Sequence, residues 1–544
     1  MNEYHLHGPP GCGKTHALAT SWVPRAVDRF GPDAVLIASL TKTAATEVAG
    51  RVPLKPERVG TLHAHAFRAL SSPTVAQTEH AAWNELFPQW ALGGGSGDEA
   101  DREAALERAK PGTPLLEALS IERHRMTDPS TWSPEVRRFG DAYTAWKREA
   151  DLVDFDDMIE LALEDVTSPP GGAEVLIVDE AQDCSKLELA LVRKWSLHAD
   201  HLVLAGDGDQ AIFEWRGADA AAFLGGDIPD SSNYKLTQSY RVPRAVHAHA
   251  TRWISRAVNR YAVDYQPRDH LGAVETAPCT YAYPDGVVDR AKRKLEADPE
   301  ATVMILGTCA RHLTPTVRRL RELGIPFHNP YRPEAGAWNP MRGGVARLRA
   351  FLAGHPDGTQ GAPRLWTVRE LAQWVELLSA QWFDGDKGAR VKRIKAEAKA
   401  QAKRTEIGPV TDTYLRELLG ERLDEELGEL FATRGVTHAV KWLEGNILSS
   451  KTSLMSFAMR MVRMHGVGAL EAVPRIVVGT VHSVKGGQAD HVFLFPDVAV
   501  AAGQRWLLGH RDPILRLFYV GMTRARDTLT LFHPKDRAYA PLQT

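Results

Sequence analysis

The stretch GPPGCGKT, residues 8–15, fits the phosphate-binding pattern G-x-x-x-x-G-K-[ST] at every fixed position. Residues 4–7 before it are long enough for a short strand, and residues 16–19 after it can begin a helix. Backbone N–H groups of the loop and of the first helical turn would then converge on a polyphosphate, whose negative charge the helix dipole favours. A glycine-rich turn with a chance lysine is the alternative. The complete motif in this context favours a nucleoside triphosphate.

Two side chains of this stretch have specific predicted roles. Lys14 would reach the terminal phosphates, and the hydroxyl group of Thr15 would hold Mg²⁺. The residues predicted to contact the nucleotide here are Gly8, Gly11, Cys12, Gly13, Lys14, Thr15 and His16.

Length and composition indicate a multidomain globular protein. The 544 residues suggest three or four domains. A net charge of −2 provides no global basic field, so nucleic-acid binding would need a local groove. The four cysteines include no C-x-x-C pair, which argues against zinc and suits a reducing cytoplasm. Because neither a signal peptide nor an apolar run of membrane-spanning length is visible, we expect a soluble, cytoplasmic protein.

The first 230 residues predict a parallel sheet with a helical insertion. Short apolar runs at 35–38 and 59–62 each precede a helical pattern, which is typical of an α/β fold. From about 73 to 150 the pattern changes to helices broken by turns. Phe139, Tyr143 and Trp146 fall there at helical spacing, and core packing is favoured over base stacking for them. Residues 154–157, DFDD, then lead a helix back to the sheet.

Two carboxylates follow the next buried run, VLIV at 175–178. Asp179 and Glu180 would lie at the carboxyl end of a parallel strand, beside the phosphate loop. There Asp179 can hold Mg²⁺ through a water, and Glu180 can orient and deprotonate the attacking water. A solvated acidic turn is the weaker alternative. The pair and the loop together predict a nucleoside triphosphatase.

A further strand at 202–205 ends in GDGDQAIFEWRGA, residues 206–218. In this segment Gln210 could sense the γ-phosphate. Phe213 and Trp215 form an aromatic pair, and Arg216 adds a cation. Taken alone, Trp215 is better explained as a buried residue at a domain interface.

The motifs, in this order, resemble superfamily 1 DNA helicases of the UvrD/Rep/PcrA type. Besides those above, the family carries T-x-x-A-A, G-T-x-H, Q-x-Y-R, T-x-H-x-x-K-G and Y-V-x-x-T-R-A segments. These stand here at 41–45, 60–63, 238–241, 480–486 and 519–525. The resemblance spans residues 8 to about 532, although the two insertions match poorly.

The resemblance implies an α/β fold with two RecA-like, parallel-sheet P-loop motor domains, each with a mainly helical insertion. It predicts the first motor domain at 1–72 and 150–230, with its insertion at 73–149. The second motor domain is expected at 231–350 and 466–544, with its insertion at 351–465.

The resemblance also implies roles for single residues. Arg241 and Arg524 would contact the γ-phosphate from the second motor domain, where the alternative for each is an ordinary surface ion pair. Tyr240 would stack on the base, and Gln488 would bind the ribose. The residues implied to line a single-strand groove are Thr61, His63, Phe213, Trp215, Arg216, Thr480 and His482. Stacking on aromatic side chains tolerates any base sequence.

Some positions depart from the family pattern. Only seven residues precede the phosphate loop, where the family usually has a glutamine segment that reads adenine. His16 replaces a common arginine, Leu40 a frequent DNA-stacking phenylalanine, and Gln488 a frequent glutamate. We therefore expect weaker or less selective nucleotide binding with catalysis intact. The basic run 387–404 could track duplex phosphates or form a solvated helix face, and the two readings are equally supported.

The resulting hypothesis is an ATP-driven translocase and helicase that acts on single-stranded DNA and at its junctions with duplex. The family resemblance implies movement 3′ to 5′ and a role in repair, replication or recombination. ATP and Mg²⁺ are the expected cofactors, in a bacterial cell or a phage-infected host. The alternative is a DNA-associated ATPase that acts as a switch or remodeller in a partner complex, with an accessory protein bound through the 351–465 insertion. A GTPase or small-molecule kinase explains the motifs poorly, and RNA as substrate stays open.

Overall fold

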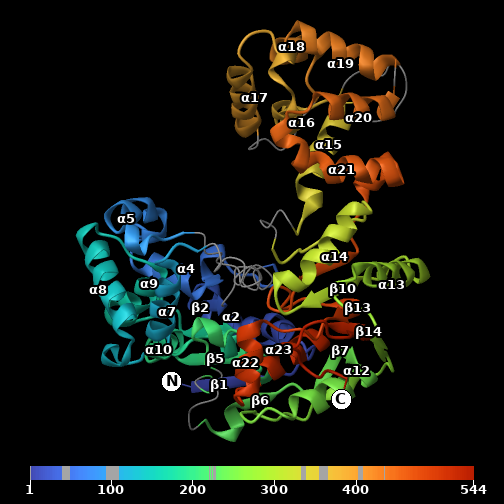
Figure 1. The fold of residues 1–544 in the computed structure, drawn as a ribbon. Helices are drawn as coiled ribbons and strands as arrows, with labels where there is room; N and C mark the ends of the chain where they lie inside the picture. Colours follow the sequence, from blue (N-terminus) through green and yellow to red (C-terminus); the bar gives the residue numbers. More distant parts are fainter. Residues whose placement is uncertain are drawn as a thin grey trace. The chain divides into compact units, whose positions relative to one another are not determined.

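The computed structural model describes residues 2–39, 50–93, 109–219, 221, 223, 228–332, 338–354, 365–401, 409–433 and 435–543. The T-x-x-A-A segment, Leu40, Lys403 and Arg404 lie outside these residues. The chain divides into two compact units, drawn in Figure 1. The first comprises residues 1–282, 301–313 and 479–544, and the second comprises residues 283–300 and 314–478.

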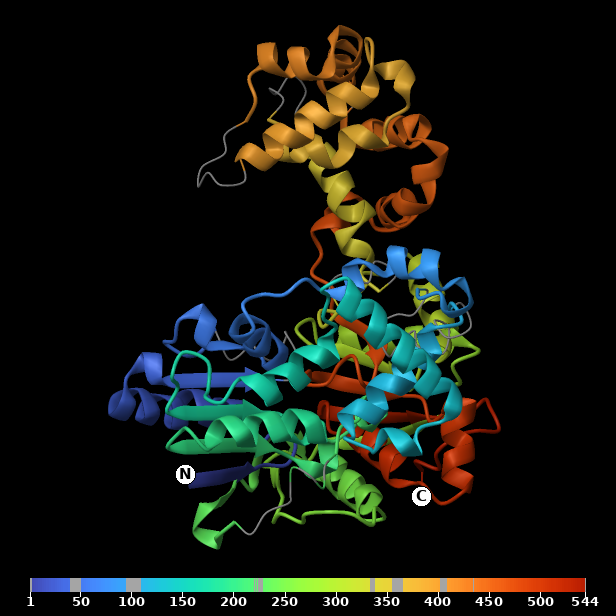
Figure 2. The same ribbon diagram turned by 90° about the vertical axis from the view of Figure 1, so that its left-hand side faces the viewer.

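A six-stranded sheet lies at the centre of the first unit, in the order β3-β2-β4-β5-β1-β6. Its strands are β1 (Asn2–His7), β2 (Val35–Ser39), β3 (Val59–Thr61), β4 (Val175–Asp179), β5 (His201–Gly206) and β6 (Asn233–Lys235). All neighbouring pairs are parallel, as predicted. Figure 2 shows several of them running side by side. Alternate residues of β2 and β4 enter two different core clusters, so both faces of the sheet are buried.

Three of the helices between these strands, α4, α9 and α10, begin at a side-chain cap. After the phosphate loop come α1 (Lys14–Ala17), a π-helical turn (Leu18–Trp22) and α2 (Val23–Phe30); the π turn was not predicted. Thr61 caps α4 (Leu62–Ala69). Capping boxes start α9 (Phe155–Asp165) and α10 (Lys186–Ser196), where Asp154 and Ser185 accept a backbone N–H and the third helical residue returns the bond.

The described part of segment 73–149 is helical, as predicted. It contains α5 (His80–Leu86), α7 (Thr113–His124) and α8 (Pro134–Glu149). Phe139, Tyr143 and Trp146 pack around Trp83 in a separate core, so the prediction of core packing is confirmed.

The first unit also contains four parallel strands in the order β10-β13-β14-β9. They are β9 (Ala273–Ala277), β10 (Val303–Gly307), β13 (Ala489–Leu494) and β14 (Ala525–Phe532). Helix α12 (Arg244–Ile254) packs against α23 (Asp512–Met522), since Trp253 donates a hydrogen bond to the carbonyl of Leu515. The QSYR motif lies on β7 (Gln238–Pro243), which pairs with β8 (Gln266–Arg268). These sheets confirm the α/β class.

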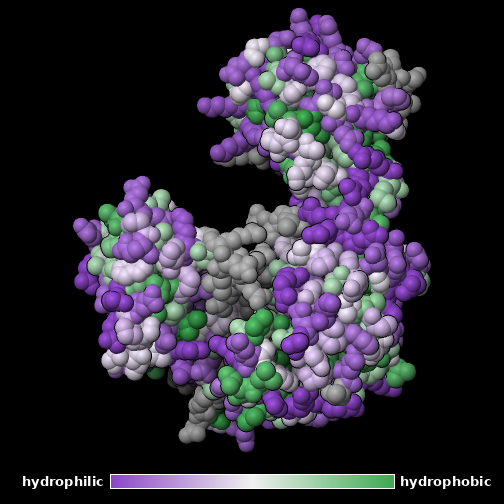
Figure 3. Space-filling view, viewed as in Figure 1, coloured by the Kyte–Doolittle hydropathy of each residue, from purple (hydrophilic) through white to green (hydrophobic). Residues whose placement is uncertain are grey.

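The second unit is mainly helical. Its helices are α13 (Pro284–Ala297), most of α14 (Ala310–Glu322), α15 (Gly344–Leu352), α16 (Val368–Trp374), α17 (Lys387–Gln401), α18 (Asp412–Leu419), α19 (Glu421–Thr433), α20 (Gly435–Asn446) and α21 (Thr452–His465). Parallel pairing joins β11 (Phe327–His328) to β12 (Ile476–Thr480) within residues that belong to this unit. Phe351, Trp366, Trp374 and Phe431 form an aromatic core. The face of this unit visible in Figure 3 is mostly hydrophilic.

The basic helix α17 makes many contacts inside its own unit. Lys387 donates to the carbonyl of Leu378, Lys395 pairs with Glu376, and Arg393 pairs with both Glu397 and Glu417. These three basic residues of the run therefore have partners within the unit, and both readings of the run, as a helix that tracks phosphates or as a solvated face, stay predictions. Among the helices of the described ranges, none is long and apolar enough to span a bilayer.

Candidate nucleotide and nucleic-acid site

The phosphate loop follows β1 and depends on its glycines. Gly11 and Gly13 both have φ of +77°, in the left-handed region that favours glycine. A Cβ atom on Gly11 would lie 2.6 Å from the Cβ atom of Arg241 and 2.7 Å from Ser239 Oγ. The buried ammonium group of Lys14 donates a 2.7 Å hydrogen bond to the carbonyl of Gly8. The lysine is therefore held inside the loop.

Thr15 and Asp179 come together as predicted for a magnesium site. Thr15 lies on α1, which follows β1 and the phosphate loop, and Asp179 is the last residue of β4. Strands β1 and β4 flank β5 in the sheet, and Thr15 Oγ1 donates to Asp179 Oδ2 at 2.9 Å. Burial and the nearby charge of Glu180 raise the pKa of Asp179. A hydroxyl and a buried carboxylate are oxygen ligands of the kind that Mg²⁺ prefers, so this pair fits the ion.

Glu180 is held in an unusual backbone conformation. Its φ is +56°, which is uncommon for a residue with a side chain and aims the carboxylate from the strand end. Gln182 Nε2 donates to Glu180 Oε2 at 2.5 Å, and Lys485 Nζ lies 3.7 Å from the same oxygen. Burial would raise the pKa of Glu180, but the positive charges of Lys485 and Lys14 outweigh burial and lower it. The carboxylate is thus ionised, which is the form that a general base needs.

A chain of hydrogen bonds through Gln182, Asp207 and Gln210 joins Glu180 to Arg524. Besides holding Glu180, Gln182 accepts a hydrogen bond from the backbone N–H of Asp207 at 2.9 Å. Asp207 Oδ2 accepts from Gln210 Nε2 at 2.8 Å, and Gln210 Oε1 accepts from Arg524 Nη2 at 2.9 Å. The predicted γ-phosphate sensor and one predicted arginine finger are therefore in direct contact.

Arg524 is not a surface ion pair, so that alternative is wrong. Only 1% of the residue is exposed, and its guanidinium group donates to the carbonyls of Val520 at 2.9 Å and Gly487 at 3.3 Å. These bonds fix the orientation of the planar guanidinium group of Arg524, which lies just after the end of α23. A fixed guanidinium group is suited to stabilising charge on a transferred phosphoryl group.

Tyr240 and Arg241 lie on β7, next to Gly11 of the phosphate loop. The N–H of Tyr240 donates to the carbonyl of Gly11 at 2.9 Å, while 73% of the tyrosine is exposed. Arg241 Nε donates to Gln488 Oε1 at 3.0 Å, so two predicted nucleotide contacts meet here. His16 is exposed on the first turn after the loop, and Cys12 is buried within it.

Several predicted nucleic-acid residues gather around Phe213. Its ring centroid lies 5.9 Å from the ring of His482 and 6.3 Å from that of Trp215. Trp215 is only partly buried, and Arg216 is exposed. The Thr480 side chain is fully buried instead, and its hydroxyl accepts a bond from the Ser483 backbone.

Thr61 and His63 lie at the start of α4. Thr61 is the helix cap, accepting from the backbone of Ala64. The ring of His63 lies 6.2 Å from that of Phe155, and His63 Nδ1 lies 3.9 Å from Glu188 Oε1.

Three functional candidates were missed by the sequence reasoning. Lys485 pairs with Asp183 and donates to the carbonyl of Gln210 at 2.7 Å; its signal was a lysine inside the quoted 479–486 segment. Phe155 is 49% exposed beside His63, and its signal was an aromatic residue between acids. Tyr265 donates to the carbonyl of Pro10 at 2.9 Å, and nothing in the sequence pointed to it.

Comparison with known families agrees with this geometry. The UvrD/REP helicase N-terminal domain matches residues 3–227, and the UvrD-like helicase C-terminal domain matches residues 475–532. Together the two matches cover just over half of the chain. The chain therefore belongs to the UvrD/Rep helicase family, whose two motor domains are RecA-like.

Individual relatives match only parts of the chain, at low sequence identity. YjcD of Bacillus subtilis, whose name describes an ATP-dependent DNA helicase, is 24% identical over 351 residues, which cover 58% of this chain and 45% of YjcD. The ATP-dependent DNA helicase PcrA of Bacillus subtilis is 27% identical over 27% of this chain and 22% of PcrA. PcrA of Leuconostoc citreum is 34% identical over 23% of this chain and 19% of that protein. The chain thus spans less than half the length of each of these relatives.

Proposed function

We propose that this protein is an ATP-dependent translocase and helicase on single-stranded DNA. The observation that carries the proposal is the hydrogen-bonded chain from Glu180 through Gln182, Asp207 and Gln210 to Arg524. It links the predicted water-activating carboxylate to a predicted arginine finger. The names of the relatives support ATP and DNA as substrates.

The finer assignments are part of this proposal. The motor domains would be residues 1–72 with 150–230 and residues 231–350 with 466–544, and the insertions 73–149 and 351–465. Movement 3′ to 5′, action at single- and double-strand junctions, a role in repair, replication or recombination and an accessory protein on the second insertion follow from the family resemblance. A cytoplasmic location is proposed from the cysteine pattern.

We assign a separate role in ATP hydrolysis to each polar residue of the nucleotide site. Lys14 would exchange its bond to the Gly8 carbonyl for phosphate oxygens. Glu180, ionised and aimed by its backbone, would orient and deprotonate the attacking water. Gln210 and Arg524 would bind the γ-phosphate together, because one already holds the other.

Thr15 and Asp179 would hold Mg²⁺, directly and through a water. The ion supplies charge neutralisation on the β- and γ-phosphate oxygens when bound. Arg241 and Gln488 would form the opposite wall of the nucleotide site, where the exposed ring of Tyr240 stacks on the base.

The first test is ATP hydrolysis with and without oligodeoxythymidine. Turnover is expected to rise about tenfold or more with the DNA, within the range of typical coupling between two sites. A protein with Glu180→Gln is the blank for contaminating activity. Turnover that ignores DNA, or that needs another protein, would contradict the motor and favour the partner-driven remodeller. A strand-displacement assay with 3′- and 5′-tailed duplexes then tests helicase activity and polarity.

Phe155 is expected to contribute to binding of single-stranded DNA. Base stacking on an aromatic side chain contributes about 1–3 kcal/mol, so Phe155→Ala should weaken the affinity about tenfold. Fluorescence anisotropy with labelled oligodeoxythymidine measures this change. Phe155→Tyr keeps the ring and is the matched control, which should bind like the wild type. If the wild type, Phe155→Ala and Phe155→Tyr bound the oligonucleotide with equal affinity, Phe155 would not contact single-stranded DNA.

A further inference from the structure

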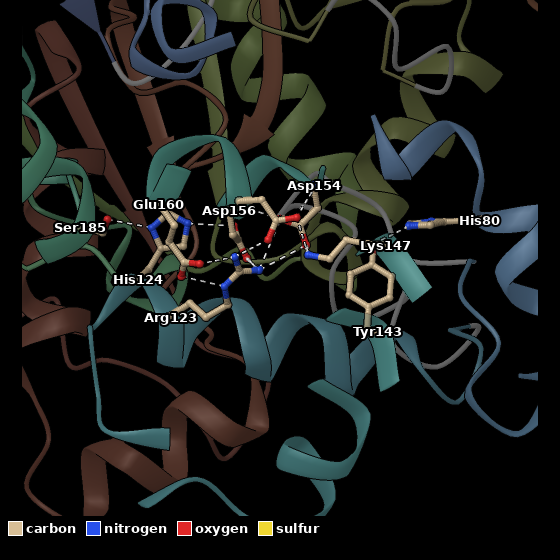
Figure 4. Close-up of polar contacts among 10 residues, drawn as sticks. His80, Arg123, His124, Tyr143, Lys147, Asp154, Asp156, Glu160 and Ser185 are labelled. Atoms are coloured by element: carbon tan, nitrogen blue, oxygen red, sulfur yellow. Dashed lines mark hydrogen bonds and ion pairs between the residues drawn. The ribbon is translucent and has the colours of Figure 1, made fainter. Parts of the chain in front are cut away.

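A buried network of charges joins segment 73–149 to the start of α9 (Figure 4). Arg123, near the end of α7, contacts Asp157 at 2.6 Å and binds Glu160 through two nitrogens at 2.6 and 2.8 Å. Lys147 on α8 pairs with Asp154 and with Asp157. Lys147 and Asp154 are almost fully buried, so each charge depends on the other. The helices of this segment are thereby fixed to the DFDD motif.

His124, the last residue of α7, extends this network toward the motor motifs. Its Nε2 atom lies 3.0 Å from Asp156 Oδ1, and its Nδ1 atom lies 2.7 Å from Ser185 Oγ. Figure 4 shows the ring between these two groups. Only 7% of His124 is exposed. The ring therefore connects the DFDD motif to the residue that starts α10.

His124 also lies against the segment that carries Trp215 and Arg216. A Cβ atom on Gly217 would be 2.6 Å from the Cβ atom of His124, so only glycine fits. The backbone of Ser185 forms a bridge to Ala218, the next residue. His124 thus contacts Ser185, one partner of this bridge, and lies against Gly217, the residue before the other partner.

A second path leads from Ser185 to the predicted groove. Ser185 and Glu188 form the capping box of α10, in which each side chain accepts from the other's backbone N–H. Glu188 Oε1 lies 3.9 Å from Nδ1 of His63. His63 in turn lies beside Phe155. By this path three contacts separate His124 from His63, whereas His124 lies directly against Gly217.

We propose that His124 is a positioning residue through which segment 73–149 sets the geometry of the single-strand groove. It would act by holding Ser185 and by supporting Gly217, and thus by orienting His63 and Trp215. The inference rests on the proposed DNA-binding function. It adds a residue outside the helicase motifs to the residues that determine DNA affinity.

The charge of His124 matters for this role. The charged and titratable groups around it are Asp156 on α9, Glu188 on α10, His63 on α4, Arg216 beside Gly217 and Arg123 on its own helix. Burial would lower the pKa of His124, but the hydrogen bond to Asp156 and the charges of Asp156 and Glu188 raise it above 6.5. The protonated ring donates to both oxygens, whereas the neutral ring with hydrogen on Nε2 must accept from Ser185.

The test compares variants of the full chain by anisotropy with labelled oligodeoxythymidine and by ATP hydrolysis. His124→Ala is expected to weaken DNA affinity about tenfold, as for other residues that couple two regions. Its KM for ATP without DNA should stay within about twofold, because His124 does not touch the nucleotide site. His124→Gln, which keeps one donor and one acceptor, should lie between His124→Ala and the wild type.

His80→Gln is the matched control, because His80 also lies in segment 73–149 but contacts Tyr143 inside that segment's own core. It should bind DNA like the wild type. If His80→Gln and His124→Ala lose affinity equally, the effect is general loosening and the inference falls. If His124→Gln, once shown to be folded by its thermal unfolding, binds like the wild type, the inference falls too.

The pH profile separates positioning from packing. DNA affinity of the wild type is expected to fall as the pH rises through the raised pKa of His124, above pH 6.5, because the ring loses its second donor. His124→Gln should lack this step. Identical profiles for the two proteins would contradict the proposal. A wild type that binds no DNA at any pH would instead overturn the proposed function, and this inference with it.

Discussion

Arg524→Lys is expected to lower kcat for ATP hydrolysis about a thousandfold, with a much smaller change in nucleotide affinity. Arginine fingers contribute about 10³–10⁵ to the rate of phosphoryl transfer, and lysine lacks the planar fork that binds Gln210 and two carbonyls at once. Steady-state turnover and binding of a fluorescent ATP analogue separate the two effects. Loss of binding with unchanged kcat would place Arg524 in the ground-state complex instead.

The control for this variant is Arg526→Ala. Arg526 lies two residues away, is 45% exposed in its side chain and lies 3.8 Å from Asp490. The Arg526→Ala variant should hydrolyse ATP at the wild-type rate. Because Arg524 is buried, thermal unfolding of both variants must show that they are folded at the assay temperature.

Glu180→Gln is expected to lower turnover by about 10²–10⁴, which is the usual contribution of a general base. The amide keeps the size of the side chain but cannot accept the proton of the attacking water. Affinity for ATP should be retained, so the variant is expected to form a stable complex with ATP and DNA. Single-turnover hydrolysis measures the chemical step directly.

Glu174→Gln is the matched control for this change, since Glu174 is exposed just before the other end of the same strand, β4. Its turnover should equal that of the wild type. If Glu180→Gln still hydrolysed ATP within about tenfold of the wild type, another group would be the base and the assignment of Glu180 would be wrong.

The parallel strands were predictable because they combine short apolar runs with polar residues at their carboxyl ends. β2 and β4 are buried along their whole length: β2 consists of five apolar or small residues, and in β4 four apolar residues lead into Asp179. The π-helical turn after α1 was not predictable. Its residues, Leu18–Trp22, have no local pattern that distinguishes it from an α-helix.

The nucleotide site was predicted as far as its motifs reach. Lys14, Thr15 and Asp179 lie together because a phosphate loop and a strand-end carboxylate have a defined geometry in a parallel sheet. The hydrogen-bonded chain of Gln182, Asp207 and Gln210 was not predictable, since it depends on side-chain directions at the ends of two strands. Long-range partners such as Lys485 and Asp183 lie 302 residues apart and leave no local signal.

Gly217 has a consequence for how this chain can be altered. Its φ of +88° and the 2.6 Å approach of the His124 Cβ atom leave no room for a side chain. Segment 73–149 is therefore not an interchangeable cassette. If this segment were replaced by the corresponding segment of a relative, the residues at positions 156, 185 and 217 would also have to match the new segment. Exchange of the segment by recombination therefore requires three further changes at positions far apart in the chain.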